Sequence, residues 1–146
     1  MAVLNVAACL PYQRMQIKGI KIIKKSKGLA KHNLLGTEGE LLAAKWLADK
    51  GFILLHQNWR HSYYEVDIIA SFNNVLHFIE VKTRRNKKFG EPEESVNEKK
   101  IINLMKAGEE YQYQHPQWKR VQYDVLSISM QPDNNAEYFF IEDIYL

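Results

Sequence analysis

Two neighbouring segments decide the fold: Tyr64-Glu65-Val66-Asp67-Ile68-Ile69-Ala70 and, a few residues further on, Val75-Leu76-His77-Phe78-Ile79-Glu80-Val81-Lys82-Thr83. Both are rich in β-branched and aromatic residues, which favour β-strands. The link between them ends in Asn73-Asn74, and asparagine tolerates the positive φ angles that a two-residue hairpin turn requires. We therefore predict an antiparallel hairpin that turns at this asparagine pair.

The predicted turn sets the register of the hairpin and brings charged residues together. Residues two apart in a strand share a face, so Glu65 and Asp67 point the same way, as do Glu80 and Lys82. The turn places Asp67 opposite Glu80 and Glu65 opposite Lys82, with Cβ atoms about 4.5–5.5 Å apart. Two carboxylates at that distance repel each other unless a cation lies between them. A one-residue slip would move the acids to opposite faces.

The opposed acids suggest a site for a hard, oxygen-seeking cation. Mg²⁺ or Mn²⁺ would fit between Asp67 and Glu80 and keep waters that a phosphate could displace. Lys82 could hold the scissile phosphate, or help to orient and deprotonate an attacking water. Val81 is expected to face the core, and its backbone carbonyl could reach the metal. The alternative is a solvated strand face on which Glu65 and Lys82 form a modest cross-strand ion pair.

The flanking sequence predicts two helices. The first is capped by Asn33, runs to about Lys50 and stops at Gly51. The second opens at the capping-box sequence Ser95-Val96-Asn97-Glu98. Helical spacing predicts that each helix buries one stripe of side chains. The stripes consist of Leu41, Ala44, Leu47 and Ala48 in the first helix, and of Ile101, Leu104, Gly108 and Tyr111 in the second.

Further strands are predicted at residues 52–59, near 121–130 and at 137–145. The order is therefore helix, three strands, helix, two strands, and no internal repeat interrupts it. This order indicates a mixed α/β sandwich in which helices cover a central sheet.

Composition limits the chain to one ordinary domain. With 146 residues, 46% hydrophobic and 25% charged, it can bury a core and is not a disordered or collagen-like sequence. The single cysteine, Cys9, cannot form an internal disulfide, which suits a reducing cytoplasm. No apolar run approaches the roughly 18 residues of a membrane span. We therefore expect a cytoplasmic protein with no membrane partner.

The positive charge is concentrated at one end. Residues 1–31 hold seven basic residues and no acidic one, while the rest carries 13 basic against 17 acidic residues, a net charge of −4. We expect residues 1–29 to be a basic extension and residues 30–146 to be the folded domain. The extension could bind phosphates as a basic arm. Alternatively, it is a solvated, partly disordered segment, or Met15 is the true start.

The two segments of the hairpin also resemble a known family. Glu65-Val66-Asp67-Ile68-Ile69-Ala70, followed by Phe78-Ile79-Glu80-Val81-Lys82-Thr83-Arg84, looks like the signature of the YraN-like proteins. These small bacterial proteins are similar to restriction endonucleases and archaeal Holliday junction resolvases, the PD-(D/E)xK superfamily. The resemblance implies a restriction endonuclease-like three-layer sandwich with a central mixed β-sheet flanked by helices. It extends from about Ala30 to the C-terminus and includes Gly36, Gly39, Glu40, Gly51, Asn58, Arg60, Gly90, Pro92, Val96, Lys100, Tyr123 and Asp124.

By position, the resemblance implies Asp67 and Glu80 as metal ligands and Lys82 as the catalytic lysine. Glu40 would be a further ligand from the first helix, and Lys100 would contact phosphate. Glu40 also has capping-box spacing after Thr37, which is the alternative interpretation. The five histidines lack metal-ligand spacing and are interpreted as surface or packing residues.

The chain departs from the family pattern at two positions. Tyr64 stands where the family usually has a small residue, which could narrow the approach to the site. Gln122 stands where the family commonly has arginine, two residues before Asp124. Neither departure affects the proposed ligands or the lysine.

The leading hypothesis is a metal-dependent endodeoxyribonuclease, with branched or damaged DNA as the substrates that a resolvase-like fold suggests. Phosphate contacts would come from Arg84, Arg85, Lys87, Lys88, Lys99 and Lys100. A branched substrate would call for a homodimer, whose interface could include Trp59, Tyr63, Tyr64 and Phe89, although core packing is the simpler explanation for each. The alternatives are a nucleic-acid-binding module that cuts little or nothing, and a protein-interaction domain on the same scaffold.

Overall fold

The computed structural model describes residues 31–85, 97–133 and 135–144, with side chains described from residue 36 onward. The elements of this part are α1 (Lys31–Asp49), β1 (Ile53–His61), β2 (Tyr64–Phe72), β3 (Val75–Arg84), α2 (Glu98–Gln114), β4 (Val121–Met130) and β5 (Ala136–Ile141). Their order is the predicted one. The expected basic extension, residues 1–29, lies outside the described residues.

The described strands form one mixed sheet in the order β1-β2-β3-β4-β5. The first three strands form an antiparallel meander, and β4 and β5 form an antiparallel pair. β3 and β4 run parallel, so the chain must cross from one end of the sheet to the other between them. The segment that makes this crossing contains α2.

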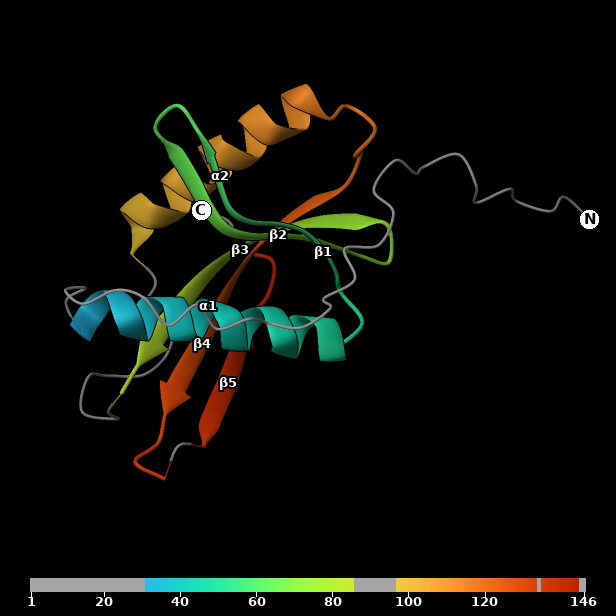
Figure 1. Ribbon diagram of the computed structural model, residues 1–146. Coiled ribbons are helices and arrows are strands. Elements are labelled where there is room, and N and C mark those ends of the chain that lie inside the picture. The colour runs from blue at the N-terminus through green and yellow to red at the C-terminus, as the bar shows by residue number, and fades with distance from the viewer. Residues whose placement is uncertain (1–30, 86–96, 134, 145–146) are drawn as a thin grey trace, which may run out of the picture.

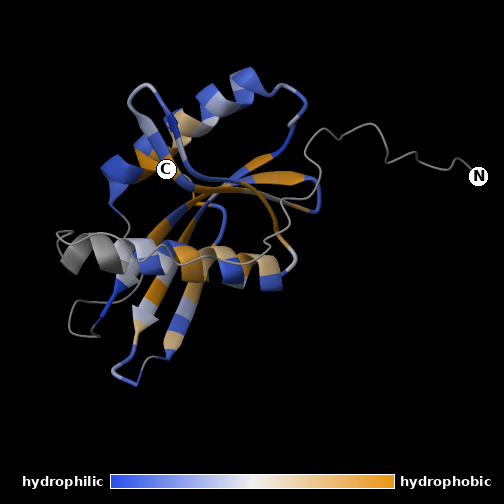
Figure 2. Cartoon of the chain, in the orientation of Figure 1, coloured by the Kyte–Doolittle hydropathy of each residue, from blue (hydrophilic) through white to orange (hydrophobic). Residues whose placement is uncertain are grey.

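The two helices cover opposite faces of the sheet (Figure 1). Each helix packs on one face of the sheet and forms a hydrophobic cluster with it. Figure 2 shows hydrophobic residues along the strands between the two helices. The fold is thus an α/β three-layer sandwich of the restriction endonuclease-like kind, as the sequence indicated. The α1 cluster includes Ala43, Leu47, Ile68, Ile79 and Leu126, and the α2 cluster includes Val66, Phe78, Leu104, Ala107 and Tyr111.

Neither helix of the described residues is long and apolar enough to cross a membrane.

The buried stripe predicted for α1 is only half right. Ala44 and Leu47 are buried, but Leu41 is 48% exposed and Ala48 is also exposed. Ala43 is fully buried in their place. The helix is therefore rotated about its axis relative to the stripe that hydrophobicity alone indicated.

The rotation of α1 follows from a close approach at Gly39. This residue is buried against Thr83 of β3, and a side chain built on it would collide with the threonine hydroxyl. Only a residue without a Cβ lets the helix approach the strand so closely. Gly39, Ala43 and Leu47 then form the row, four residues apart, that faces the sheet.

The ends of the helices confirm one predicted stop and correct both predicted caps. Because α1 begins at Lys31, a cap at Asn33 is wrong. Gly51, just beyond the end of α1, has a φ of +95°, which suits the predicted glycine stop. The start of α2 differs from the prediction: the helix begins at Glu98, and its cap is Asn97, whose side chain accepts a hydrogen bond from the Lys99 backbone at 3.0 Å. A cap at Ser95 is therefore wrong. The predicted buried face of α2 is confirmed, with Ala107 added.

We predict that Gly39→Ala lowers the free energy of unfolding by about 1–3 kcal/mol, because the new methyl group overpacks the contact with Thr83. Gly36→Ala is the matched control in the same helix, since its Cβ would meet nothing within 4 Å. That change should raise stability by roughly 0.5–1 kcal/mol through helix propensity. Urea unfolding of both variants measures the difference, and equal effects would contradict the close approach.

Candidate functional site

The candidate site lies where β2 and β3 separate. The predicted hairpin register is confirmed from the Phe72–Val75 pair to the Ile68–Ile79 pair. Beyond Ile68, β2 stays paired with β1, whereas β3 continues alongside β4. Figure 1 shows the β1–β2 end turning toward α2 while β3 runs on under α1. The separation opens the sheet next to the acidic residues.

This separation changes the partners predicted for Glu65. Its backbone pairs with Arg60 of β1, and its carboxylate accepts a hydrogen bond from the Arg60 guanidinium at 2.7 Å. The expected opposition of Glu65 and Lys82 is therefore wrong, because the two strands are no longer neighbours at that level.

Asp67 lies just past the last paired residues, so the ladder stops short of the predicted pair of Asp67 with Glu80. The Asp67 side chain instead bonds to the backbone of β3. Its Oδ2 accepts a hydrogen bond from the Val81 N–H at 2.7 Å. A side chain thus satisfies a backbone donor on the side of β3 that β2 has left. Val81 itself packs against the α1 cluster, as expected, so Glu80 and Lys82 on either side of it face α2.

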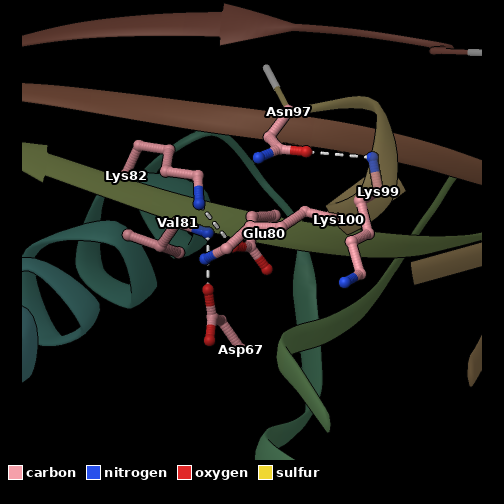
Figure 3. A network of polar contacts seen from close by, with 7 residues as sticks. All are labelled: Asp67, Glu80, Val81, Lys82, Asn97, Lys99 and Lys100. Atoms are coloured by element: carbon pink, nitrogen blue, oxygen red, sulfur yellow. Dashed lines mark hydrogen bonds and ion pairs between the residues drawn. The ribbon is translucent and has the colours of Figure 1, made fainter. Parts of the chain in front are cut away.

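Two lysines converge on Glu80 (Figure 3). Lys82 Nζ donates to Glu80 Oε1 at 2.7 Å, and Lys100 Nζ donates to the same oxygen at 3.2 Å. The Lys82 and Glu80 side chains are 18% and 19% exposed, whereas Lys100 is 58% exposed. The structure therefore places Lys100 of α2 beside the acids and the lysine that the hairpin sequence predicted to form a site.

A cavity of about 370 Å³ opens beside these charges, between α2 and the separating strands. It includes both acids, so their carboxylates can be reached by a small ligand. It is lined by Tyr63, Tyr64, Glu65, Asp67, Glu80, Lys100, Asn103 and Leu104.

The surroundings of Asp67 make its negative charge costly. Burial raises its pKa from 3.8 to about 7, and the charges of Glu80 and Glu40 contribute to the same shift. The Val81 N–H and Lys82 act in the opposite direction but do not offset burial. Near neutral pH this carboxyl group is therefore divided between its protonated and ionised forms.

The pKa values of the two lysines are shifted in opposite directions. Burial lowers the pKa of Lys82, and Lys100 lowers it further, while the bond to Glu80 partly restores it. The contact with Lys82 and the charge of Glu80 raise the pKa of the more exposed Lys100. Of the two, Lys82 is the one that can more readily give up its proton.

Glu40 lies near the site but has a different immediate partner. It belongs to α1, which begins at Lys31, so it does not cap a helix start as the Thr37 alternative required. Its Oε2 accepts a hydrogen bond from Asn58 Nδ2 at 2.8 Å. Asn58 has a φ of +52° and, by the register of β1 and β2, lies across from Asp67. Hydrophobic patterning could not have indicated this asparagine, and the only signal was its place in the family resemblance.

The expected phosphate-binding residues lie in different places. Lys100 reaches Glu80, and Lys99 is exposed in the first turn of α2. Arg84 is half-buried at the end of β3, while Arg85 lies 3.8 Å from Glu38 of α1. Lys87 and Lys88 lie outside the described residues, as does Phe89 of the expected interface.

The remaining aromatic candidates for an interface differ in exposure. Trp59 and Tyr64 pack against the α2 cluster, whereas Tyr63 is 99% exposed.

A buried polar network supports the strands on the far side of the sheet from this opening. Asp124 is fully buried and accepts hydrogen bonds from Gln122 Nε2 and the Asp143 N–H, both at 2.9 Å. His77 Nδ1 lies 2.7 Å from its other oxygen. Gln122 thus bonds to the aspartate two residues further along the strand. His77 is a packing residue, as expected.

The residues fit a hard divalent cation in number and type of donor. Among the described residues, no group of three or more His, Cys, Asp or Glu side chains converges as a ready-made cage. Mg²⁺, however, is commonly held by one or two carboxylates together with waters and phosphate oxygens. Asp67 and Glu80 supply two carboxylates at one cavity, with Asp67 carrying a charge that a cation would stabilise.

The fold and this acid–lysine cluster define a restriction endonuclease-like α/β protein. The model of a family described as "Uncharacterised protein family UPF0102" matches residues 39–128. The chain belongs to this family, which is the YraN-like family that the hairpin sequence resembles.

Relatives named "UPF0102 protein" occur in several organisms. The protein from Phocaeicola vulgatus is 40% identical over 100 residues, which cover 68% of this chain and 83% of the relative. The one from Rhodococcus opacus is 43% identical over 100 residues, or 66% and 84% of the two chains. The Flavobacterium johnsoniae protein is 38% identical over 120 residues, or 80% and 94%.

We predict that the free energy of unfolding falls as pH rises from about 4 to about 7. The folded protein keeps the Asp67 proton through this range, whereas the unfolded chain loses it near the ordinary value of 3.8. Because the native state then binds more protons, raising the pH favours unfolding by an amount on the order of a few kcal/mol.

Urea unfolding across this pH range, without divalent cations, measures the slope. Asp67→Asn should flatten it, whereas Asp49→Asn, an exposed carboxylate paired with Lys45, should leave it unchanged. A slope that survives in Asp67→Asn would show that another group causes it.

Proposed function

We propose that this protein is a metal-dependent, nuclease-like phosphodiesterase that acts on DNA. The observation that supports this proposal is that Asp67 and Glu80 line one cavity, that Lys82 bonds to Glu80, and that the pKa of Asp67 is raised to about 7. An ion pair with only a structural role would need one acid and one base, such as Glu80 and Lys82. Asp67 is a second, partly buried acid, and its negative charge costs free energy that a bound cation would offset.

Asp67 and Glu80 would hold Mg²⁺ or Mn²⁺, with the Val81 carbonyl and Glu40 as further candidates for the coordination shell. The bound ion would polarise a phosphate and lower the pKa of a water. Because Asp67 must lose its proton to bind a cation, metal affinity should rise with pH. Glu80 would lose its hydrogen bond to one of the two lysines when it binds the ion.

Hydrolysis of a phosphodiester forms a bond from phosphorus to the oxygen of water and breaks the bond to one sugar oxygen. Lys82, whose pKa is lowered by burial, could accept a proton from that water or stabilise the charge on the phosphate. Lys100 keeps its positive charge at the cavity and would hold a phosphate oxygen.

DNA is the proposed substrate because basic residues surround the acids. Lys99 and Lys100 lie in the first turn of α2, and Arg84 ends β3, so groups that could bind phosphate lie on both elements. Contacts of this kind position a backbone and carry no base sequence, so recognition would depend on shape. A dimer would let two such sites act on a branched substrate.

A nucleic-acid-binding module is the second candidate. Two observations favour it: both lysines already neutralise Glu80, and the described part of the chain holds no group of three metal-binding side chains. Such a module would bind DNA with a strong salt dependence and would need no metal.

The test is incubation of the full chain with labelled duplex, single-stranded, flap and four-way-junction DNA in Mg²⁺, Mn²⁺ or EDTA. We predict cleavage that requires metal, and rates lowered on the order of 10²-fold or more in Asp67→Asn and Lys82→Ala. Thermal unfolding gives a second readout. Mg²⁺ should raise the melting temperature of the wild type and not that of Asp67→Asn.

Asp49→Asn and Lys45→Ala are charge-matched controls, because they remove one partner each of an exposed ion pair on α1. Both should cleave like the wild type. Cleavage that persists in Asp67→Asn would indicate a contaminating nuclease. Intact DNA under all conditions, together with a salt-sensitive band shift, would favour the binding module.

A further inference from the structure

Tyr63 is a large aromatic side chain that is held in solvent at the edge of the candidate site. It is 99% exposed, yet it lines the cavity that contains Asp67, Glu80 and Lys100. It lies in the turn between β1 and β2, where Ser62 has a φ of +54°. A tyrosine in this position buries nothing in the folded chain, so packing does not explain it.

The turn that carries Tyr63 is fixed to α2 by its neighbours. His61 Nε2 lies 3.4 Å from Glu110 Oε1, and His61 Nδ1 lies 3.4 Å from Gln114 Nε2. The His61 ring also stacks on Trp59, with ring centres 6.0 Å apart and planes 14° from parallel. These contacts support the backbone of the turn next to Tyr63, so a ligand that binds there would need to order only the Tyr63 side chain.

We propose that Tyr63 stacks on an unpaired base next to the phosphodiester that the acids act on. This inference rests on the proposed function and narrows its substrate class to DNA with an unpaired nucleotide at the cleavage point: single strands, flaps or gaps. A continuous duplex has its bases stacked on one another, so it offers no free face to the ring.

The lining of the cavity offers a contact for each part of a nucleotide, and a cation or proton at its acids, Glu65, Asp67 and Glu80, would remove their repulsion of a phosphate. Lys100 lies at the same cavity and attracts a phosphate, whereas Tyr63 offers an aromatic face and Asn103 an amide that can pair with a base edge. A volume of about 370 Å³ is in the range of pockets that hold one small ligand. Tyr64 adds a second ring to the lining.

The test measures binding without turnover, by fluorescence anisotropy of labelled oligonucleotides in EDTA at low salt. Tyr63→Ala should weaken binding of oligothymidylate and gapped DNA about ten-fold and leave blunt duplex binding unchanged. Tyr63→Phe should bind like the wild type, because the ring and not the hydroxyl makes the contact. Tyr63→Leu should bind as weakly as Tyr63→Ala.

Tyr113→Ala is the matched control. Tyr113 is 84% exposed and belongs to α2, but it lines a different cavity with Trp118 and Lys119. Its loss should leave every affinity unchanged. As a direct readout, an oligonucleotide with one 2-aminopurine should lose fluorescence on binding to the wild type and to Tyr63→Phe, and not on binding to Tyr63→Ala.

The outcomes separate this inference from the nuclease. Binding of single strands that depends on Tyr63, without cleavage in any metal, would support the stacking site and refute the enzyme. Metal-dependent cleavage of duplex that ignores Tyr63→Ala would support the enzyme and overturn the stacking site. Equal losses on duplex and single strands, an effect of Tyr113→Ala, or no binding of single strands by the wild type would also overturn it.

Discussion

The hydrogen bond from the Val81 N–H to Asp67 is the interaction on which the rest of the site depends. It satisfies the backbone of β3 where β2 leaves it, and so lets the hairpin open without an unpaired buried donor. Where the strands separate, the end of β1 next to the turn contacts α2, while β3 stays paired with β4. The cavity and its acids are consequences of that opening.

The separation also explains the electrostatics of the site. Two acids and two lysines meet between three elements, but the charges are unequally shared, because both lysines bond to Glu80. Burial and the repulsion of Glu80 and Glu40 raise the pKa of Asp67, and the hydrogen bond from the Val81 N–H only partly offsets this rise. Protonation, a metal ion or a phosphate contact at Lys82 would each change the balance for all four groups.

Sequence patterns predicted the parts of this arrangement that are local. Strand propensity and the asparagine turn gave the hairpin register as far as Ile68, and alternation placed Glu80 and Lys82 on one face. Tertiary effects set the rest. The last residue of β2 that pairs with β3 is Ile68, so Asp67 and Glu65 lie beyond the paired region. Glu65 pairs with Arg60 of β1 instead, which an alternating pattern cannot show. Likewise, the partner of Glu40 depends on the left-handed backbone of Asn58, and the rotation of α1 depends on a contact with β3.

The contact at Gly39 has a consequence beyond packing. Gly39 fixes how close α1 lies to β3, and the next residue, Glu40, carries one of the charges that raise the pKa of Asp67. The distance between α1 and β3 therefore contributes to the raised pKa of Asp67, after the larger effects of burial and Glu80. A side chain at Gly39 would move the helix outward, weaken the repulsion from Glu40 and make Asp67 a stronger acid. The absence of a side chain at one position of a helix thus affects the charge state of a carboxyl group on a strand.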